Sequence, residues 1–157
     1  MWYVVLTKSR QEQRAAANLS NQSGEVYLPM LKIVRIKNGK RTQQEEPLFP
    51  GYLFLKKTDN NQLVSKVRST YGVRGLLRFG EQPVSVANQL IEDIRQRTVR
   101  ALSPPELKPG QHVQLAEGPF KDYQAIFHSY KGKERAIILI NLLGQQNHLL
   151  VELGQIT

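Results

Sequence analysis

The 157-residue sequence contains no cysteine, which excludes disulfide bonds and thiolate metal sites and is typical of a reducing compartment. Long apolar runs are also missing. The apolar stretch near the start, Trp2 to Leu6, spans five residues, whereas a membrane-spanning helix needs about 20. We therefore expect a soluble, cytoplasmic protein that does not enter a membrane.

Catalytic and metal-binding patterns are absent as well. The three histidines, at positions 112, 128 and 148, have no metal-ligand spacing, and the acidic residues form no recognisable acid/base pair. The glycines form no phosphate-binding loop, because the sequence has no GxxxxGK[ST] pattern. The sequence therefore predicts a protein that is not an enzyme and that holds no metal or cofactor.

Acidic residues are scarce in the first hundred positions, which carry 17 Lys and Arg against 8 Asp and Glu. The remaining residues carry five of each sign, so the whole net charge of +9 belongs to the first part of the chain. Such an excess predicts a polyanionic partner for that part, such as nucleic acid. Basic surfaces without such a partner are also common, so composition alone leaves both interpretations open.

The stretch from Glu45 to Lys57, EEPLFPGYLFLKK, contains a strand that is apolar on both faces. Successive side chains of a strand point to opposite faces, so Tyr52 and Phe54 share one face while Leu53 and Leu55 share the other. A sheet in so small a domain usually leaves one face in water. We therefore expect another segment of the chain, or a partner, to cover the second face.

The first hundred residues mix strands and helices without regular alternation, which predicts an α+β fold with an antiparallel sheet flanked by helices. Trp2 to Leu6 is typical of a buried strand. Ser9 and Glu12 have the spacing of a capping box, which predicts a helix over residues 10–21. Two further helices are expected from residue 59 or 60 to about 69, and from Ser85, as a cap, to about residue 100.

A tight turn is predicted at Asn38-Gly39, because both central residues of a type I′ turn need positive φ. The strands beside it would run over residues 31–37 and 40–44. Four cations gather around the tip of this hairpin: Arg35, Lys37, Lys40 and Arg41. The tip either lies along a phosphate backbone, where position matters and base sequence does not, or is simply a soluble turn.

A proline-bearing linker, residues 101–109, separates a first domain, residues 1–100, from a second, residues 110–157. The second domain carries two conflicting patterns. Short β-branched runs between glycine turns, such as Ala136 to Ile140, predict a small β-barrel. A second pattern predicts helix instead, because four aromatic residues recur at helical spacing: Phe120, Tyr123, Phe127 and Tyr130. Residue patterns do not choose between the two.

Four stretches, in order, resemble the NusG family of transcription elongation factors. They are WYVV at the start, FPGYLFL in the central strand, TYGVRGLLRFG at residues 70–80, and PGQHVQLAEGPFKDYQAIF after the linker. The resemblance covers essentially the whole chain. It implies an N-terminal domain that rides on RNA polymerase and a C-terminal KOW domain that recruits other factors.

Within the family the chain looks more like the specialised RfaH-type branch than like general NusG, because of EPLFP before the central strand, Ala125 in QAIF, and NLL at residues 141–143. Gly51 in FPGY and Pro119 in GPF match the general form. In RfaH-type proteins the C-terminal domain is an α-hairpin packed on the N-terminal domain, and it becomes a five-stranded KOW-type β-barrel once released. The resemblance implies either of these folds for residues 110–157.

The resemblance also assigns roles to individual residues. Tyr52, Phe54 and Phe79 would bind the clamp helices of the largest RNA polymerase subunit. The non-template DNA strand would contact Lys8, Gln11, Arg14, Arg68, Thr70, Tyr71 and Arg74. The closed state would join the domains through Glu46, Arg135, Phe120, Phe127 and Leu139, and Leu143 would contact a small-subunit ribosomal protein.

These assignments imply a monomeric, operon-specific elongation and antitermination factor that suppresses pausing and termination. Two alternatives stay open: a general NusG-like elongation factor without autoinhibition, and a ribosome-associated KOW protein that binds RNA. The first hypothesis differs from both alternatives in one structural respect, because it requires the second domain to cover the first in the intact protein.

Overall fold

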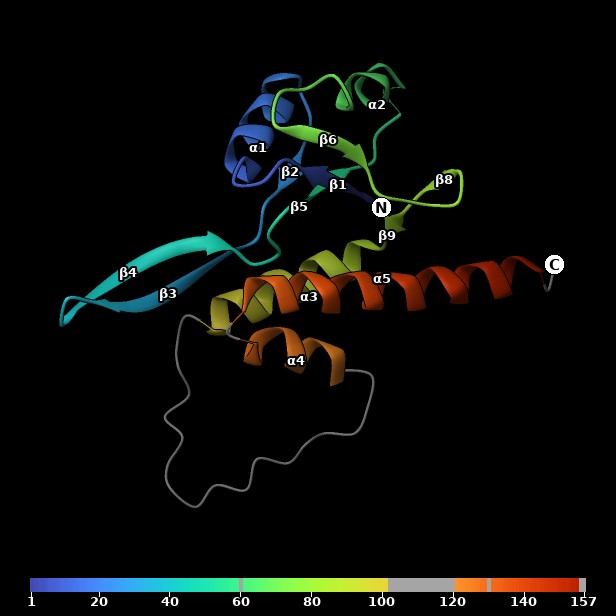
Figure 1. Ribbon diagram of the computed structural model, residues 1–157. Coiled ribbons are helices and arrows are strands. Elements are labelled where there is room, and N and C mark those ends of the chain that lie inside the picture. The colour runs from blue at the N-terminus through green and yellow to red at the C-terminus, as the bar shows by residue number, and fades with distance from the viewer. Residues whose placement is uncertain (60, 102–120, 130, 156–157) are drawn as a thin grey trace.

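The computed structural model describes residues 1–59, 61–101, 121–129 and 131–155. Within them a five-stranded antiparallel sheet lies between two groups of helices, and a long two-stranded hairpin projects from one side (Figure 1). The protein is therefore of the α+β class, as the strand and helix patterns predict. Residues 102–109 of the expected linker, and Phe120, lie outside the described residues.

The central sheet has the strand order β2-β5-β1-β6, and β9 also pairs with β1. Every pairing in this sheet is antiparallel. Strands β5 and β1 form the middle of this order. Val4 of β1 lies opposite Phe54 of β5. The strands are β1 (Trp2–Thr7), β2 (Val26–Tyr27), β5 (Tyr52–Lys56), β6 (Val73–Leu76) and β9 (Ser85–Val86).

Helices cover both faces of this sheet (Figure 1). On one face, α1 (Glu12–Asn21) and α2 (Asn61–Val67) pack with Leu53 and Leu55. On the other face, α3 (Asn88–Ala101), α4 (Lys121–His128) and α5 (Gly132–Gln155) pack over Phe54. Phe54 is 0 % exposed. The second apolar face expected from the sequence is therefore covered by the chain itself.

The projecting hairpin consists of β3 (Met30–Lys37) and β4 (Lys40–Pro47) (Figure 1). Asn38 and Gly39 have φ angles of 54° and 74°, the positive values that a type I′ turn requires, so the predicted turn is confirmed. Pairing continues from this turn back to Met30 opposite Pro47. A second, short hairpin consists of β7 (Arg78–Phe79) and β8 (Gln82–Pro83).

Helix α1 begins at Glu12 rather than Arg10, and the predicted capping box is wrong. Gln11 occupies the N-cap position without a side-chain hydrogen bond. The Glu12 carboxylate instead accepts a hydrogen bond from the backbone N–H of Gly51, at 3.0 Å. A tertiary partner has thus taken the carboxylate that local spacing assigned to a cap. The prediction for Ser85 is also wrong, since this residue lies in β9 and α3 starts at Asn88.

The described part of residues 110–157 is helical. α4 and α5, which we call the tail helices, pack against each other. The run from Ala136 to Ile140, which also suits a barrel strand, lies inside α5 in this structure. Gly144 lies within α5 without interrupting it. In the part of the chain that the structure describes, no helix combines the length and the apolar content needed to cross a bilayer.

Candidate functional site

The face of β5 that carries Tyr52 and Phe54 forms one side of an interface with the tail helices. The Phe54 ring stacks on Tyr27 and meets Phe49 edge-on, each at 6.3 Å between ring centroids. The tail adds buried side chains to the same apolar cluster, namely Tyr123, Ile126, Leu139, Leu142 and Leu143. Burying a large apolar side chain contributes about 1.5–3 kcal/mol, so apolar packing is the main force that holds the tail here.

A charged pair joins the tail to the end of β4. Arg135 of α5 donates a hydrogen bond from Nη2 to Oε1 of Glu46. Arg135 is only 1 % exposed, and its Nε and Nη1 atoms have no hydrogen-bond partner among the described residues. A buried cation with unpaired N–H groups loses hydration that one carboxylate does not fully replace. The pair therefore orients α5 more than it stabilises docking.

A second polar contact joins α3 to α4. The Arg97 guanidinium lies over the ring of Tyr123, 5.0 Å from its centroid, in a cation–π arrangement. Burial raises the pKa of the Tyr123 hydroxyl; the Asp93 carboxylate adds to the rise, and Arg97 opposes it. Tyr123 is therefore neutral near pH 7 while α4 is docked.

Other residues that the sequence assigns to these interfaces lie in different environments. Leu139 and Leu143 are fully buried against the β5 face, and Phe127 is half-buried there. Phe79 lies on the β7–β8 hairpin, where it is 40 % exposed. It is not part of the described cluster around Phe54. The structure thus gathers the tail residues on the β5 face and leaves Phe79 at the surface.

An aromatic ring and a cation form an exposed pair beside α1. Tyr71 is 74 % exposed, and the Arg14 guanidinium lies over its ring, 5.5 Å from the centroid. The Asn18 side chain donates a hydrogen bond to the Tyr71 carbonyl at 3.3 Å. Gly72 brings this turn close to α1, since a Cβ at position 72 would lie 3.0 Å from the backbone nitrogen of Ala15. The ring is thus held in solvent next to a positive charge.

Other predicted DNA-contacting residues adjoin this pair. The Lys8 N–H donates to the Gly72 carbonyl at 2.8 Å, which joins the β1–α1 connection to the same turn. Thr70 is buried: its Oγ1 donates to the Lys66 carbonyl at 2.9 Å and accepts from the Gln22 side chain at 3.0 Å. Its hydroxyl therefore supports the turn that presents the aromatic ring. The exposed members of the set are Lys8, Arg14, Arg68, Tyr71 and Arg74, and Gln11 is half-buried.

The β3–β4 hairpin carries cations at the end that projects from the body of the protein (Figure 1). Lys37, Lys40 and Arg41 are exposed there. The side chain of Arg35 lies outside the described part of the structure. The ribbon thus holds positive charge away from the sheet and from the tail helices.

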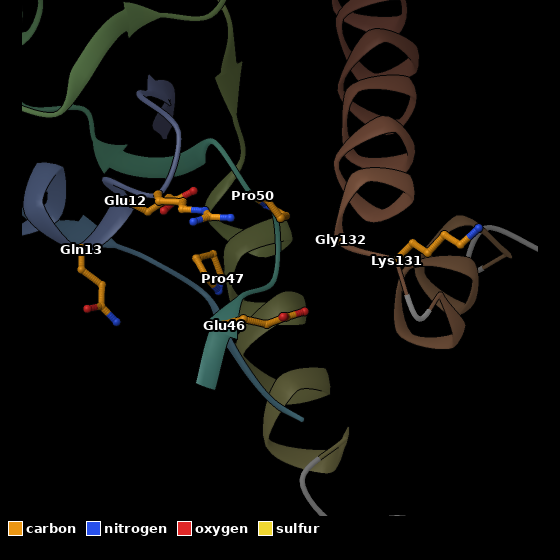
Figure 2. Close-up of a pocket in the computed structure, with 8 residues that line it drawn as sticks. Glu12, Gln13, Glu46, Pro47, Pro50, Lys131 and Gly132 are labelled. Carbon is orange, nitrogen blue, oxygen red and sulfur yellow. The ribbon is translucent and has the colours of Figure 1, made fainter. Parts of the chain in front are cut away.

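A cleft of about 580 Å³ lies where the tail meets the rest of the protein. Figure 2 shows Glu46, Pro47 and Pro50 on one side of it, with Lys131 and Gly132 on the other. The remaining walls come from Arg10, Glu12 and Gln13 at the start of α1. Among the described residues, no three His, Asp or Glu side chains lie close enough together to hold a metal ion.

Three of these contacts have no signal in the sequence. Glu12 has cap spacing, and nothing local marks it as a partner of Gly51. The Lys-Gly-Lys around Gly132 predicts a turn and gives no sign that this residue lies across a cleft from Pro50. Arg97 and Tyr123 lie on either side of the linker, so no spacing rule connects them. All three depend on how distant segments are brought together.

Comparison with known proteins identifies the family of this chain. A family model described as "Transcription termination factor nusG" matches residues 1–95, more than half of the chain. The chain belongs to the NusG family. The NusG match includes every strand of the central sheet and both hairpins, while α4 and α5 lie beyond it. The protein is therefore a transcription termination or antitermination factor of this family.

Individual NusG proteins are similar along nearly the whole chain. "Transcription termination/antitermination protein NusG" of Escherichia coli (strain K12) is 26% identical over 170 residues, covering 99% of this chain and 94% of that protein. The protein of the same description from Haemophilus influenzae is 27% identical, with 99% and 92% covered. A solved structure, "Domain interaction in Thermotoga maritima NusG", is 29% identical, has a TM-score of 0.45, and covers 60% of this chain and 55% of that one.

Proposed function

We propose that this NusG-family protein is an operon-specific antitermination factor of the RfaH type, kept inactive by its own tail. The observation that carries the proposal is the position of α4 and α5 over the β5 face, where Phe54 is completely buried. The family resemblance assigns this face to the clamp helices of RNA polymerase. A tail that occupies the face excludes the polymerase from it.

Release of the tail frees the face for RNA polymerase. Tyr52 and Phe54 then bind the clamp helices, and the released tail refolds as a five-stranded KOW-type barrel. The sequence is compatible with both folds, because the run from Ala136 to Ile140 suits a strand as well as the helix that it forms here. In the barrel, Leu143 leaves the buried cluster and contacts a small-subunit ribosomal protein, which couples transcription to translation.

The surface around Arg14 and Tyr71 binds the non-template DNA strand of a paused complex. An exposed aromatic ring stacks on bases while neighbouring cations neutralise phosphates, and single-strand binding relies on these two interactions. Lys8, Arg68 and Arg74 supply the further charge. Contact at this surface recruits the protein to its DNA element, and polymerase binding then suppresses pausing and termination.

The cationic tip of the β3–β4 hairpin lies along the phosphate backbone of the transcribed DNA. Its exposed Lys37, Lys40 and Arg41 suit contacts that fix position without reading sequence. The first hundred residues hold the entire net positive charge of the chain, which supports two nucleic-acid contacts on this one domain.

The masking step is tested with two matched substitutions on α5. Leu139→Glu places a carboxylate in the fully buried cluster and should displace the tail, whereas Ile137→Glu places the same charge on the exposed side of the same helix. We expect Leu139→Glu to raise capture of core RNA polymerase in a pull-down by about tenfold or more, because burying an unpaired charge is strongly unfavourable. Ile137→Glu should match the wild type. Equal capture by all three proteins would remove masking from the proposal.

A second candidate is a general NusG-like elongation factor whose face is free. Gly51 in FPGY, Pro119 in GPF and the similarity to general NusG proteins favour it. Far-UV circular dichroism and NMR of the intact chain distinguish the two candidates, because the second expects β signals from residues 111–157. A ribosome-associated KOW protein would instead co-sediment with ribosomes in the absence of polymerase.

A further inference from the structure

The start of α5 fits against Pro50 with no space to spare. A Cβ placed at position 132 would lie 2.7 Å from Cγ of Pro50 and 3.1 Å from Nη2 of Arg135. Real Cβ atoms essentially never approach other heavy atoms to 2.7 Å, and the Pro50 ring is rigid. Figure 2 shows Pro50 and Gly132 facing each other across the edge of the cleft. Glycine is therefore the one residue type that fits this contact unchanged.

Two hydrogen bonds fix the turn that contains Pro50. Gly51, with φ of 87°, donates its N–H to Oε1 of Glu12 at 3.0 Å. The Gly51 carbonyl accepts the N–H of Thr7 at 2.9 Å. The turn is thus connected to helix α1 through a side chain and to strand β1 through the backbone.

Glu12 is well suited to hold this turn. It is 6 % exposed, and it lies in the first turn of α1, where the helix dipole favours a negative charge. A carboxylate at this depth is stable only when its oxygens are hydrogen-bonded or partly hydrated. Within the described residues its one side-chain hydrogen bond is to the N–H of Gly51. The position of the turn therefore depends on this carboxylate together with the backbone hydrogen bond to Thr7.

We infer that Pro50 and Gly51 form a docking turn shaped for glycine at position 132 of the tail, and that Glu12 is the positioning residue that holds this turn in place. The inference rests on the proposed function, in which tail docking is the inactive state. It adds a steric requirement to that state which is separate from the apolar cluster and which adjoins the Glu46–Arg135 pair, because a Cβ at position 132 would also approach Nη2 of Arg135.

Two glycines of the same helix supply the test. Alanine favours helix over glycine by about 1 kcal/mol in a helix interior, where Gly144 lies, and by less at the first residue of α5, where Gly132 lies. Helix propensity alone therefore predicts that neither Gly132→Ala nor Gly144→Ala destabilises α5. The two positions differ in the space around them, because a Cβ at position 144 would meet nothing within 4 Å in the described structure, whereas one at position 132 would meet Pro50. The docking turn therefore predicts opposite results for the two variants.

The measurement is hydrogen–deuterium exchange of the full chain, followed at the amides of residues 135–143. We expect exchange in Gly132→Ala to be about tenfold faster than in the wild type, because overpacking shifts the tail toward the undocked state. Gly144→Ala should exchange at the wild-type rate or more slowly. Unchanged exchange in α1 checks that Gly132→Ala still folds. Wild-type exchange of residues 135–143 in Gly132→Ala would overturn the inference.

A second substitution tests whether Pro50 is the obstacle. Pro50→Ala removes the ring atoms that a Cβ at position 132 would meet. In the Gly132→Ala background it should restore exchange to within about twofold of the Pro50→Ala single variant, since the two positions are in contact and couple. Additive effects of the two changes would show that the Pro50 contact is not what disfavours alanine.

The role of Glu12 is tested by replacing its acceptor. Glu12→Gln keeps an oxygen for the N–H of Gly51 and should leave tail exchange at the wild-type rate, whereas Glu12→Leu should accelerate it severalfold because a partly buried donor is left unpaired. Gln13→Leu, at the exposed neighbour, is the control. Equal exchange in Glu12→Leu and Gln13→Leu would remove Glu12 from the inference. If Leu139→Glu still releases the tail, the proposed function survives that result.

Discussion

At the scale of single residues, Tyr71 and Arg14 carry separable parts of the proposed DNA contact. The ring offers stacking, which is insensitive to salt, and the guanidinium offers charge, which salt screens. Thr70, next to the ring, has its hydroxyl turned inward to Lys66 and Gln22. Neighbouring residues of one turn thus have different functions: Tyr71 is exposed for binding, and Thr70 holds the turn in place.

Replacing these two side chains should therefore have different consequences for single-stranded DNA. Tyr71→Ala should weaken binding by about 1–3 kcal/mol per stacked base and leave the salt dependence unchanged. Arg14→Ala should lower the slope of log K against log salt by about 0.7. Fluorescence anisotropy with a labelled 12-nucleotide strand at several salt concentrations measures both effects. Phe79→Ala, at an exposed aromatic on the β7–β8 hairpin, is the control, and equal losses in Phe79→Ala and Tyr71→Ala would contradict the assignment.

At the scale of elements, α4 is held on α3 by a tyrosine that must stay neutral. Burial raises the pKa of Tyr123, so the docked state binds this proton more tightly than the undocked state does. The stabilisation is complete below the ordinary tyrosine pKa of about 10 and is lost as the pH rises through the raised value. Tail docking should therefore weaken in alkaline solution.

Tyr123→Phe should remove part of this alkaline loss, because phenylalanine has no proton to release. Circular dichroism at the helix wavelength, recorded for the full chain from pH 8 to 11.5, measures the difference between the two proteins. Burial raises the pKa of Tyr27 and of Tyr52 as well, so the Tyr123→Phe variant retains a smaller alkaline loss from these residues. Identical pH profiles would exclude Tyr123 as a titrating group of the interface.

The elements also differ in how far sequence predicts them. The uninterrupted apolar run YLFL predicts β5, and the alternating directions of strand side chains predict its two buried faces. The Asn38-Gly39 turn is predictable because few residues accept positive φ. The tail is not predictable in this way, since residues 136–140 suit a helix and a strand equally, and no local pattern reveals their packing against the β5 face. The capping-box prediction for Glu12 is wrong for a related reason. The carboxylate can accept a hydrogen bond from the nearby helix start or from the distant Gly51, and sequence spacing describes only the nearby partner.

At the scale of the whole molecule, the Glu46–Arg135 pair joins the tail to the N-terminal part asymmetrically. Arg135 is buried, whereas Glu46 is partly exposed and within reach of water. Removing Glu46 therefore leaves an uncompensated buried cation, while removing the charge of Arg135 leaves a carboxylate that water reaches. The two halves of the pair are not equivalent.

Glu46→Ala should disfavour docking by about 3–5 kcal/mol and release the tail. Arg135→Met fills a similar volume without charge and should keep the tail docked to within about 1 kcal/mol, because it removes the cost of burying the guanidinium while Glu46 remains accessible to water. Hydrogen exchange in α5 measures both changes. Equal release by the two variants would mean that the pair locks the closed state rather than orienting it.

The complete burial of Phe54 has a quantitative consequence for competition. Under the proposed function, polymerase binds only molecules whose tail has left, so the apparent dissociation constant equals the intrinsic one divided by the uncovered fraction. With roughly one molecule in a hundred uncovered, a protein with an intrinsically strong site competes as if it were about a hundredfold more dilute. Under the proposed function, this protein would then bind polymerase only where a DNA element raises its local concentration.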